Sequence, residues 1–430
     1  MLTVREALHR CLATAPPVQK ELVPLNVALG RILSEDVTSQ TSLPPWDNSA
    51  MDGFAVRSVD TSSASSETTA ADDCFTEGES TGQGPWLEVT EIIAAGSVPK
   101  LDLAEGEAAR IMTGAPVPVG CDAVVMQEHT TFKDNRVQIH QEARPGQHIR
   151  REGENLQSGD LAVAKGTVLK AGHLGLCASV GRSMLTVARQ PRVGIVSTGD
   201  EIVRSDQPLG PGQIYSSNSA TLTALVSMAG GIPVDCGIAP DNLEATREAF
   251  QLAAECDLVL STGGVSVGDF DLVRDAMVSL GATMEFWKIR MKPGKPLALG
   301  IIGGKPAFGL PGNPVSCHVG FLQFVRPWLR TALGDPRPFL PVVKARLGFP
   351  FRKRAGRVEF SRVNVLLTDD GWLAEDTGNQ SSGNPLSMAT ATGLLLAEEG
   401  ALDLPIGAQV SIQLLQDHID GISNPGYPWQ

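Results

Sequence analysis

Between residues 191 and 334 the chain alternates short apolar runs with amphipathic stretches of helical spacing. The run RVGIVST at 192–198 and the run DLVLST at 257–262 each lead into a loop rich in glycine and acidic residues. This alternation is typical of buried parallel strands joined by crossover helices, which cover both faces of the sheet. We therefore predict a central three-layer α/β domain with a parallel-rich sheet at residues 186–334.

The rest of the chain has a different texture. Short β-type runs such as GFAV and CDAVVMQ, divided by glycine and proline, fill the region from Gly30 to Gly146, and β-type runs return after Pro336. Because 430 residues exceed what one hydrophobic core holds, we predict a multidomain α/β plus β chain in which β-rich domains flank the α/β domain. The other expected domains are a mixed N-terminal linker or dimer domain at 1–30 and 145–185, a β-rich domain at 31–144, and a C-terminal β-barrel-like domain at 335–430.

Three helices are expected from local signals. Thr3 and Glu6 have the spacing of a capping box at the start of TVREALHRCLATA. Asn242 stands where it can cap the helix of NLEATREAFQLAAEC. A long apolar stretch at 315–333 predicts a buried helix that follows the loop LPGNPVS.

Composition excludes some classes of function. The chain carries 35 Lys and Arg against 48 Asp and Glu, a net charge of −13, which argues against a nucleic-acid binder. It does not exclude a small anionic ligand, because the local field in a cleft can override net charge. No apolar run reaches the roughly 18 residues of a membrane span, and the seven cysteines lack C-x-x-C spacing. We therefore expect a cytoplasmic protein without nucleic-acid or membrane partners.

Five loops that follow predicted strands hold most of the polar and glycine residues of the α/β region. In a parallel sheet such loops meet at the carboxyl edge, where ligands bind. The sequence therefore predicts that they build one site. The loops are STGDE (197–201), APDN (239–242), STGGVSVGDFD (261–271), KPGKP (292–296) and LPGNPVS (310–316).

The loop STGGVSVGDFD offers Gly263 and Gly264 ahead of a predicted helix. Backbone amides at such a position can form a nest for an anion. The competing interpretation is a tight turn that needs glycine for its geometry alone. The loop matches neither a Walker A loop nor a G-x-G-x-x-G fingerprint, which argues against an ordinary NTPase or dinucleotide enzyme.

Acidic side chains gather in the same loops. Carboxylates beside an anion nest suit a Mg²⁺ ion that bridges them to phosphate oxygens. Each one alone could instead cap a helix, a common role of aspartate. The candidates are Asp200, Glu201, Asp241, Asp269 and Asp271.

The stretch RMKPGKPLALG forms a cationic corner in this acidic chain. Lys292 and Lys295 lie three residues apart across Pro-Gly, and Lys288 adds a charge if the preceding strand ends there. A run of charges is often only a solvated surface. Two prolines and flanking apolar residues constrain this one, so we predict an oxyanion site.

Several motifs together resemble the molybdopterin molybdenumtransferase (MoeA) family, in order from about Val4 to Leu396. They are LPPWDNSAMDGFAVR (43–57), RIMTGAPVP (110–118), DAVVMQE, VSTGDE, IYSSNS, STGGVSVGD, MKPGKP and FGLPGNPVS. The resemblance implies an elongated homodimer with four domains per chain and an active site shared between chains. It implies Mg²⁺-dependent insertion of molybdate into adenylylated molybdopterin, which releases AMP and forms molybdenum cofactor. Molybdopterin adenylyltransferase and molybdoenzyme maturation proteins are the implied partners.

The resemblance also assigns roles to residues of this chain. Asp241 and Asp271 match acidic positions assigned to Mg²⁺ and phosphate cleavage. The other implied catalytic residues are Asp52, Thr113, Glu201 and Lys288. The implied molybdate ligands are Ser266, Lys292, Lys295, Arg357 and Ser382. The implied molybdopterin and nucleotide contacts are Arg150, Thr198, Gly199, Asp200, Ser217, Asn218, Gly263, Gly264, Pro311, Gly312 and Asn313.

One position departs from the family pattern, since Asn155 stands where a carboxylate is expected. An amide keeps hydrogen bonding but loses charge and metal affinity, so Glu154 could take over its role. Two alternative functions are an adenylyltransferase acting on molybdopterin and a non-catalytic gephyrin-like scaffold. The extra β-rich regions and MKPGKP favour insertion. The residue types do not separate molybdate from tungstate, since both are tetrahedral dianions.

Overall fold

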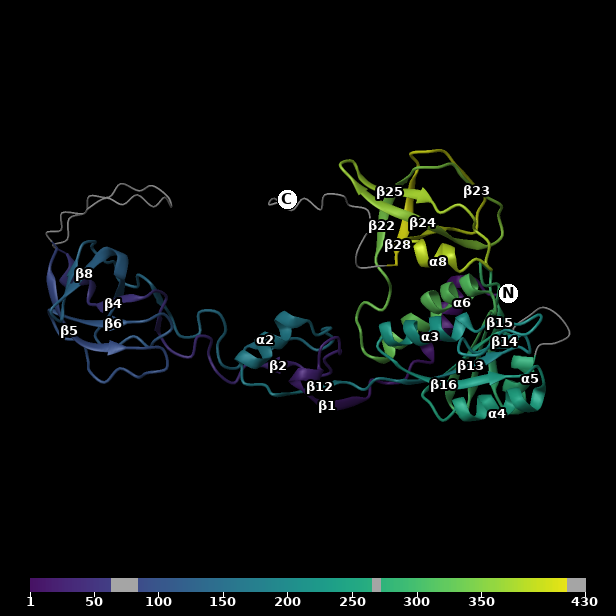
Figure 1. The fold of residues 1–430 in the computed structure, drawn as a ribbon, viewed down its shortest axis with the longest axis horizontal. Helices are drawn as coiled ribbons and strands as arrows, with labels where there is room; N and C mark the ends of the chain where they lie inside the picture. The colour runs from purple at the N-terminus through teal and green to yellow at the C-terminus, as the bar shows by residue number, and fades with distance from the viewer. Residues whose placement is uncertain (63–83, 265–271, 416–430) are drawn as a thin grey trace.

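The molecule, described by a computed structural model over residues 1–62, 84–264 and 272–415, is elongated (Figure 1). A β-rich domain lies at one end and a small middle domain follows it (Figure 1). The α/β domain and the C-terminal β domain lie together at the other end (Figure 1). Across the described ranges, no helix is both long and apolar enough to cross a bilayer.

The α/β domain contains the six-stranded sheet that positions the site. Its strand order is β16-β13-β17-β21-β20-β18, and the first four strands are parallel. Strand β20 runs against β21, and β18 runs against β20, so the carboxyl end of β18 shares an edge with those of the parallel strands. The strands are β13 (Arg192–Thr198), β16 (Ile232–Ala239), β17 (Leu258–Thr262), β18 (Thr283–Lys288), β20 (Pro296–Ile302) and β21 (Lys305–Leu310).

Helices cover both faces of this sheet and enclose two apolar cores. One core joins the sheet to α3 (Ser217–Met228), α6 (Pro314–Gly320) and α7 (Arg326–Ala332). The other joins it to α4 (Leu243–Ala253) and α5 (Leu272–Ser279). The predicted three-layer α/β architecture is therefore confirmed. The buried helix expected at 315–333 is interrupted by a π-helical turn at Phe321–Val325.

Helix α1 (Val4–Ala13) begins at the predicted capping box, in which Thr3 and Glu6 bond reciprocally. Its small buried face, Ala7 and Cys11, packs into the α/β core rather than into the middle domain. The grouping of residues 1–30 with 145–185 stays a prediction, and this helix itself contacts the α/β core. The physical reason is that two small side chains cannot form a core alone, whereas α7 offers an apolar surface next to them.

The middle domain combines two distant parts of the chain. Strand β1 (Lys20–Pro24) pairs with β12 (Met184–Ala188), and β2 (Val37–Thr38) pairs with β11 (Leu161–Val163). Helix α2 (Ala171–Ser179) packs on these strands around a small apolar core. Both connections between this domain and the α/β domain therefore run side by side.

The β-rich domain is a six-stranded sheet in the order β7-β4-β6-β5-β9-β8. All of its pairings are antiparallel except that between β5 and β6. A two-stranded pair, β3 (Asn48–Ser49) with β10 (Ile149–Arg150), lies beside it. The strands of the sheet are β4 (Gly53–Val56), β5 (Trp86–Ile93), β6 (Glu107–Ile111), β7 (Ala123–Met126), β8 (Thr130–Lys133) and β9 (Arg136–Ile139).

The C-terminal domain is a barrel, because its sheet closes through a pairing of β24 (Val358–Thr368) with β26 (Gly393–Ala397). Strand β19 (Met291–Lys292), from the loop between β18 and β20, adds to β24 in parallel. A short strand from the α/β domain therefore pairs with the sheet of the C-terminal barrel, next to the site described below. The remaining strands of the barrel are β22 (Val342–Leu347), β25 (Gly371–Asp376) and β28 (Gln409–Leu414).

Candidate functional site: two adjoining cavities at the carboxyl edge of the sheet

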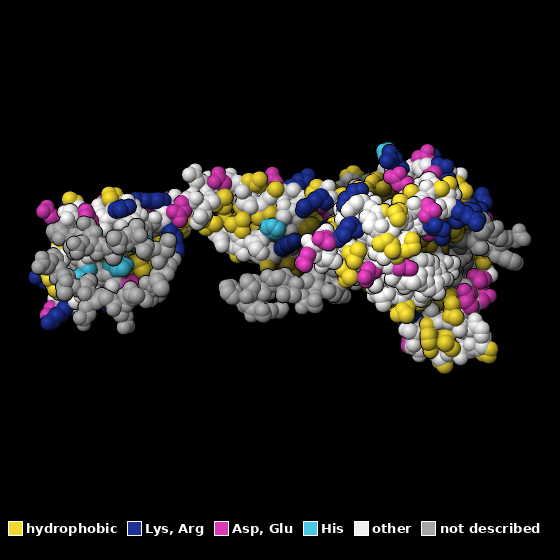
Figure 2. All heavy atoms as spheres, turned by 90° about the horizontal axis from the view of Figure 1, so that it is seen from above, with side chains coloured by type: hydrophobic (Ala, Val, Ile, Leu, Met, Phe, Trp, Pro, Cys, Tyr) yellow, Lys and Arg dark blue, Asp and Glu magenta, His cyan; other side chains and the backbone are white. Residues whose placement is uncertain are grey.

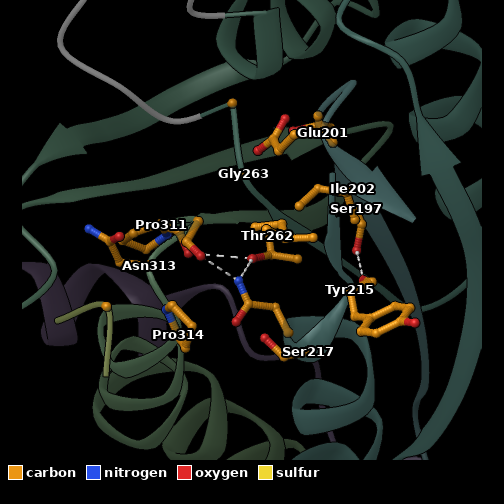
Figure 3. A pocket seen from close by; sticks show the side chains of 18 of the residues that line it. Ser197, Glu201, Ile202, Tyr215, Ser217, Thr262, Gly263, Pro311, Asn313 and Pro314 are labelled. Carbon is orange, nitrogen blue, oxygen red and sulfur yellow. Dashed lines mark hydrogen bonds between the residues drawn. The ribbon is translucent and has the colours of Figure 1, made fainter. Parts of the chain in front are cut away.

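The larger cavity, of about 740 Å³, lies where the carboxyl ends of β13, β16, β17 and β21 meet. Figure 3 shows Glu201, Thr262 and Asn313 around it, each from a different loop. The sequence analysis placed these loops at one edge, and the structure brings them to one cavity. The predicted residues that line it are Thr198, Gly199, Glu201, Ser217, Asn218, Asp241, Gly263, Gly264, Pro311, Gly312 and Asn313.

Gly263 and Gly264 form a turn that admits only glycine. Their φ angles are +93° and +61°, in the region that other residues rarely adopt. A Cβ on Gly263 would lie 2.4 Å from the carbonyl oxygen of Thr198, which is too close for any side chain. Turn geometry therefore explains both glycines, and an anion nest at this loop stays a prediction.

Two residues that line this cavity carry a buried side-chain oxygen without a partner. Thr198 Oγ1 and Asn218 Oδ1 have no hydrogen-bond partner within the described ranges. Asn218 belongs to the first turn of α3, and Ser216, the residue before this helix, makes no side-chain capping hydrogen bond. The Thr198 hydroxyl can donate to an anionic group of a ligand, whereas Asn218 Oδ1 can only accept a hydrogen bond from a ligand hydroxyl or amine.

The acidic residues of the loops divide into two groups. Glu201 and Asp241 line the larger cavity, whereas Asp200 lines a shallow neighbouring hollow. Asp200 and Asp241 exchange backbone-to-carboxylate contacts of 2.9 and 3.4 Å, which fixes the two loops against each other. Asp269, Asp271 and Ser266 lie outside the described residues. Within those residues no cluster of three or more His, Cys, Asp or Glu could hold a metal ion.

The smaller cavity, of about 440 Å³, lies between the α/β domain and the barrel. Lys292 and Lys295 line it from the KPGKP loop, and Arg357 and Ser382 line it from the C-terminal domain. The four expected oxyanion ligands that are described thus come together. Lys288 ends β18, as predicted, but it lines neither cavity.

Sequence reasoning missed two charged residues of the smaller cavity. Glu359 Oε1 accepts a hydrogen bond from Lys292 Nζ over 2.9 Å. Arg362 is 1 % exposed and donates to Ser387 Oγ and to the carbonyls of Asn379 and Ser381. Burial lowers the pKa of Arg362, and the charge of Glu359 acts in the opposite direction. Charged residues inside the apolar strand VEFSRVNV were the signal that could have identified both.

The two cavities adjoin, because Pro296 and Asn313 line both of them. Pro296 starts β20 directly after the lysine loop, and Asn313 precedes α6. One elongated ligand could therefore reach from the cavity with acidic side chains into the cationic cavity.

Three predicted catalytic or binding residues belong to the β-rich part of the chain, and the sheet of this part, with β4 and β6, lies at the end of the molecule away from the α/β domain (Figure 1). Thr113 N and Oγ1 donate to Asp52 Oδ1 over 2.7 and 2.8 Å, and these bonds lower the pKa of Asp52. Arg150 belongs to β10 of the small β3–β10 pair. One chain by itself does not bring them to the cavities. Asn155, which stands where the family pattern has a carboxylate, donates a hydrogen bond from its backbone nitrogen to the carbonyl of Leu43.

Family models match most of the chain. A model of the MoeA N-terminal region (domains I and II) matches residues 2–181. A model of a probable molybdopterin binding domain matches residues 194–331, and one of the MoeA C-terminal region (domain IV) matches residues 344–415.

Individual relatives agree. The chain is 38 % identical to molybdopterin molybdenumtransferase 2 of Mycobacterium tuberculosis, over 91 % of this chain and 94 % of that protein. It is 34 % identical to molybdopterin molybdenumtransferase of Bacillus subtilis, over 100 % and 96 %. A crystal structure of a molybdopterin biosynthesis MoeA protein from Pyrococcus horikosii matches with a TM-score of 0.81 and 32 % identity, over 97 % of this chain and 100 % of that one.

Proposed function

This chain belongs to the MoeA family of molybdopterin molybdenumtransferases, and we propose that it inserts molybdenum from molybdate into adenylylated molybdopterin and releases AMP. It is a transferase of molybdenum cofactor biosynthesis. The observation that carries the proposal is the adjacency of the two cavities through Pro296 and Asn313. An oxyanion in one cavity and an organic substrate in the other would meet at this wall.

Molybdate would occupy the smaller cavity. Lys292, Lys295 and Arg357 supply positive charge there, and Ser382 supplies a hydroxyl donor. Ammonium and guanidinium groups form charge-assisted hydrogen bonds to oxyanions, and these are about twice as strong as neutral ones. The dithiolene sulfurs of the substrate would lie at the shared wall, where they can reach the metal atom of the oxyanion.

The adenylylated end of the substrate would occupy the larger cavity. The unpartnered oxygens of Thr198 and Asn218 and the amides at the start of α3 would hold its polar groups. Positioning and charge neutralisation, rather than covalent catalysis, govern cleavage of a phosphoanhydride. Release of AMP after molybdenum transfer would empty this cavity for the next substrate.

We propose a magnesium ion as a further ligand of the larger cavity, on the strength of two carboxylates that line it. The carboxylates of Glu201 and Asp241 line the cavity, and neither has an ion-pair partner in the described part of the chain. Mg²⁺ prefers carboxylate oxygens together with water and substrate phosphate, so two protein ligands suffice. Asp241, with Asp271, would hold the ion. When bound, it would neutralise the negative charge that develops on the phosphate oxygens.

In a homodimer with a shared active site, the β-rich domain of one chain would supply residues to the cavities of the other chain. Asp52 precedes β4 and Thr113 follows β6, two strands that lie at the end of the molecule away from the α/β domain (Figure 1), and Arg150 belongs to β10. The middle domain exposes Leu22 and Met184, on paired strands, together with Val27, Leu29 and Leu161. Figure 2 shows apolar side chains exposed over the middle of the molecule. Pairing of two chains there would bury these side chains and place each β-rich domain near the other chain's cavities.

One assay tests the proposed function. Purified protein is mixed with adenylylated molybdopterin, Mg²⁺ and molybdate, and AMP is quantified by chromatography. We expect AMP release that requires molybdate. An adenylyltransferase would supply the substrate, and molybdoenzyme maturation proteins in the cytoplasm would receive the product. Release at the same rate without molybdate would contradict the proposal.

A further inference from the structure

Glu359 places a negative charge in the smaller cavity, which is otherwise lined by cationic side chains. Four cationic side chains line this cavity, from Lys292, Lys295, Arg357 and Arg362, and Glu359 is the single acidic residue among the described lining residues. Four positive charges and one negative charge leave a formal excess of three. A cavity built only to hold a dianion tightly would gain by omitting the carboxylate, because like charges repel.

The fold holds this carboxylate in place. Strand β19 pairs with β24 so that Lys292 and Glu359 are direct partners in the register, which sets their side chains next to each other. The Lys292 side chain is 51 % exposed, whereas that of Glu359 is 15 % exposed. Ser361 Oγ lies 3.4 Å from the same Glu359 oxygen and donates to it. The lysine can therefore swing toward a ligand, but the carboxylate remains in the wall.

We propose that Glu359 is a built-in counter-ion that weakens the binding of dianions and sets the charge specificity of the cavity. This inference rests on the proposed function, because that function is what identifies the ligand of the cavity as an oxyanion. An incoming anion must share Lys292 with Glu359, and its repulsion by the carboxylate grows in proportion to its own charge. A dianion therefore loses twice as much binding free energy as a monoanion of the same shape.

Weak binding serves the transfer step. Interactions that hold the bound oxyanion as tightly as the transition state do not speed the reaction, and excess affinity for the ground state raises the barrier. The carboxylate keeps the cationic cavity from holding its dianion too firmly to pass it to the sulfurs. Glu359 is thus a residue that tunes affinity, and no chemical step is assigned to it.

The test replaces the charge and keeps the shape. Glu359→Gln retains an oxygen that can accept the Lys292 hydrogen bond. Asp370→Asn is the matched control, because Asp370 is an acidic residue of the same barrel that pairs with Arg346 and is 80 % exposed. It follows the far end of β24, roughly 30 Å along the strand from Glu359. Isothermal titration calorimetry measures the binding of molybdate, a tetrahedral dianion, and of perrhenate, a tetrahedral monoanion, to the full-length proteins.

We expect Glu359→Gln to bind molybdate about tenfold more tightly than the unmodified protein, and perrhenate only about threefold more tightly, since Coulomb energy is linear in ligand charge. Asp370→Asn should change neither affinity. If Glu359→Gln leaves molybdate binding unchanged, or weakens it because the carboxylate only orients Lys292, the inference is overturned and the proposed function stands. If neither the unmodified protein nor any variant binds either anion, the cavity is not an oxyanion site. The inference on Glu359 and the proposed function are then both contradicted.

Discussion

The Asn218 side chain ties α3 to the loop that follows β21. Its Nδ2 donates to the carbonyl of Gly312 over 2.7 Å and to Thr262 Oγ1 over 2.8 Å. Three elements that line the larger cavity are thus fixed by one amide. Its Oδ1 remains buried without a partner among the described residues, so the same side chain can also hold a ligand.

Replacing Asn218 should loosen this cavity. Asn218→Ala removes two donated hydrogen bonds and should lower the free energy of unfolding by about 1–2 kcal/mol. Asn218→Asp should impair AMP release more than Asn218→Ala does, because both variants lose the donor to the Gly312 carbonyl but only the carboxylate adds a negative charge that repels this oxygen and an anionic substrate. Urea unfolding and the AMP assay measure the two effects. Ser227→Ala is the control, because the Ser227 hydroxyl donates within α3, to the carbonyl of Thr223. Equal activity of both Asn218 variants would contradict the prediction.

Lys292→Ala should weaken molybdate binding by about 10–100-fold, since a charge-assisted donor is lost. The side chain is half exposed, so the melting temperature should change by only about 1–2 °C. Calorimetric titration and thermal unfolding measure these quantities. Lys344→Ala serves as control, because Lys344 lies on β22 of the barrel and bonds to Ser411. A large drop in melting temperature would instead indicate a structural role for Lys292.

Gly263→Ala should destabilise the fold by about 2–4 kcal/mol, because the new Cβ adds a clash to an unfavourable φ. The clash would be with the carbonyl oxygen of Thr198, 2.4 Å from the Cβ position. Gly237→Ala isolates the contribution of φ, since Gly237 has φ +88° and nothing within 4 Å of its Cβ position. The free energy of unfolding of Gly237→Ala should fall by only about 1–2 kcal/mol. Denaturant unfolding compares them, and equal losses would show that the turn can relax away from Thr198.

His318 should make stability depend on pH. Burial lowers its pKa from 6.5 to about 4, so the folded protein keeps the ring neutral. The unfolded chain protonates His318 as the pH falls below about 6.5, whereas the folded protein keeps it neutral. The contribution of His318 to the free energy of unfolding is therefore fully present above about pH 6.5 and is lost on acidification toward pH 4. The loss should approach about 1.4 kcal/mol per pH unit. Urea unfolding of the unmodified protein and of His318→Gln between these pH values should give a difference that changes with pH, because all other groups are shared. A constant difference would contradict the prediction.

Mixing two inactive variants tests the shared active site. Asp52→Ala and Lys292→Ala change different domains, because Asp52 precedes β4 of the β-rich sheet and Lys292 lines the smaller cavity. In a mixed dimer one site would carry both substitutions and the other would carry neither. Random exchange of equal amounts should then restore about a quarter of the normal activity. The AMP assay before and after exchange measures recovery. No recovery, in a sample shown by light scattering to contain dimers, would mean that each site uses residues of one chain.

Local patterns were enough for much of the architecture. The alternation of apolar runs predicted the three-layer α/β domain, and the capping signals at Thr3 and Asn242 predicted helix starts that the structure confirms. These features depend on neighbours within a few residues, whose spacing the chain itself fixes. The π-turn at Phe321–Val325 was not predicted, because a fully buried helix shows no face periodicity to interrupt.

The sequence by itself determined which loops stand at the carboxyl edge, because a parallel strand followed by a crossover helix leaves its loop only one place to go. Only the tertiary structure decided which side chains meet there. Lys292 and Glu359 are 67 residues apart and become partners because β19 leaves its own domain to join the barrel. Likewise, α1 lies on the α/β core, and Asp52 lines neither cavity. Such contacts depend on register and domain packing, which periodicity along the chain does not encode.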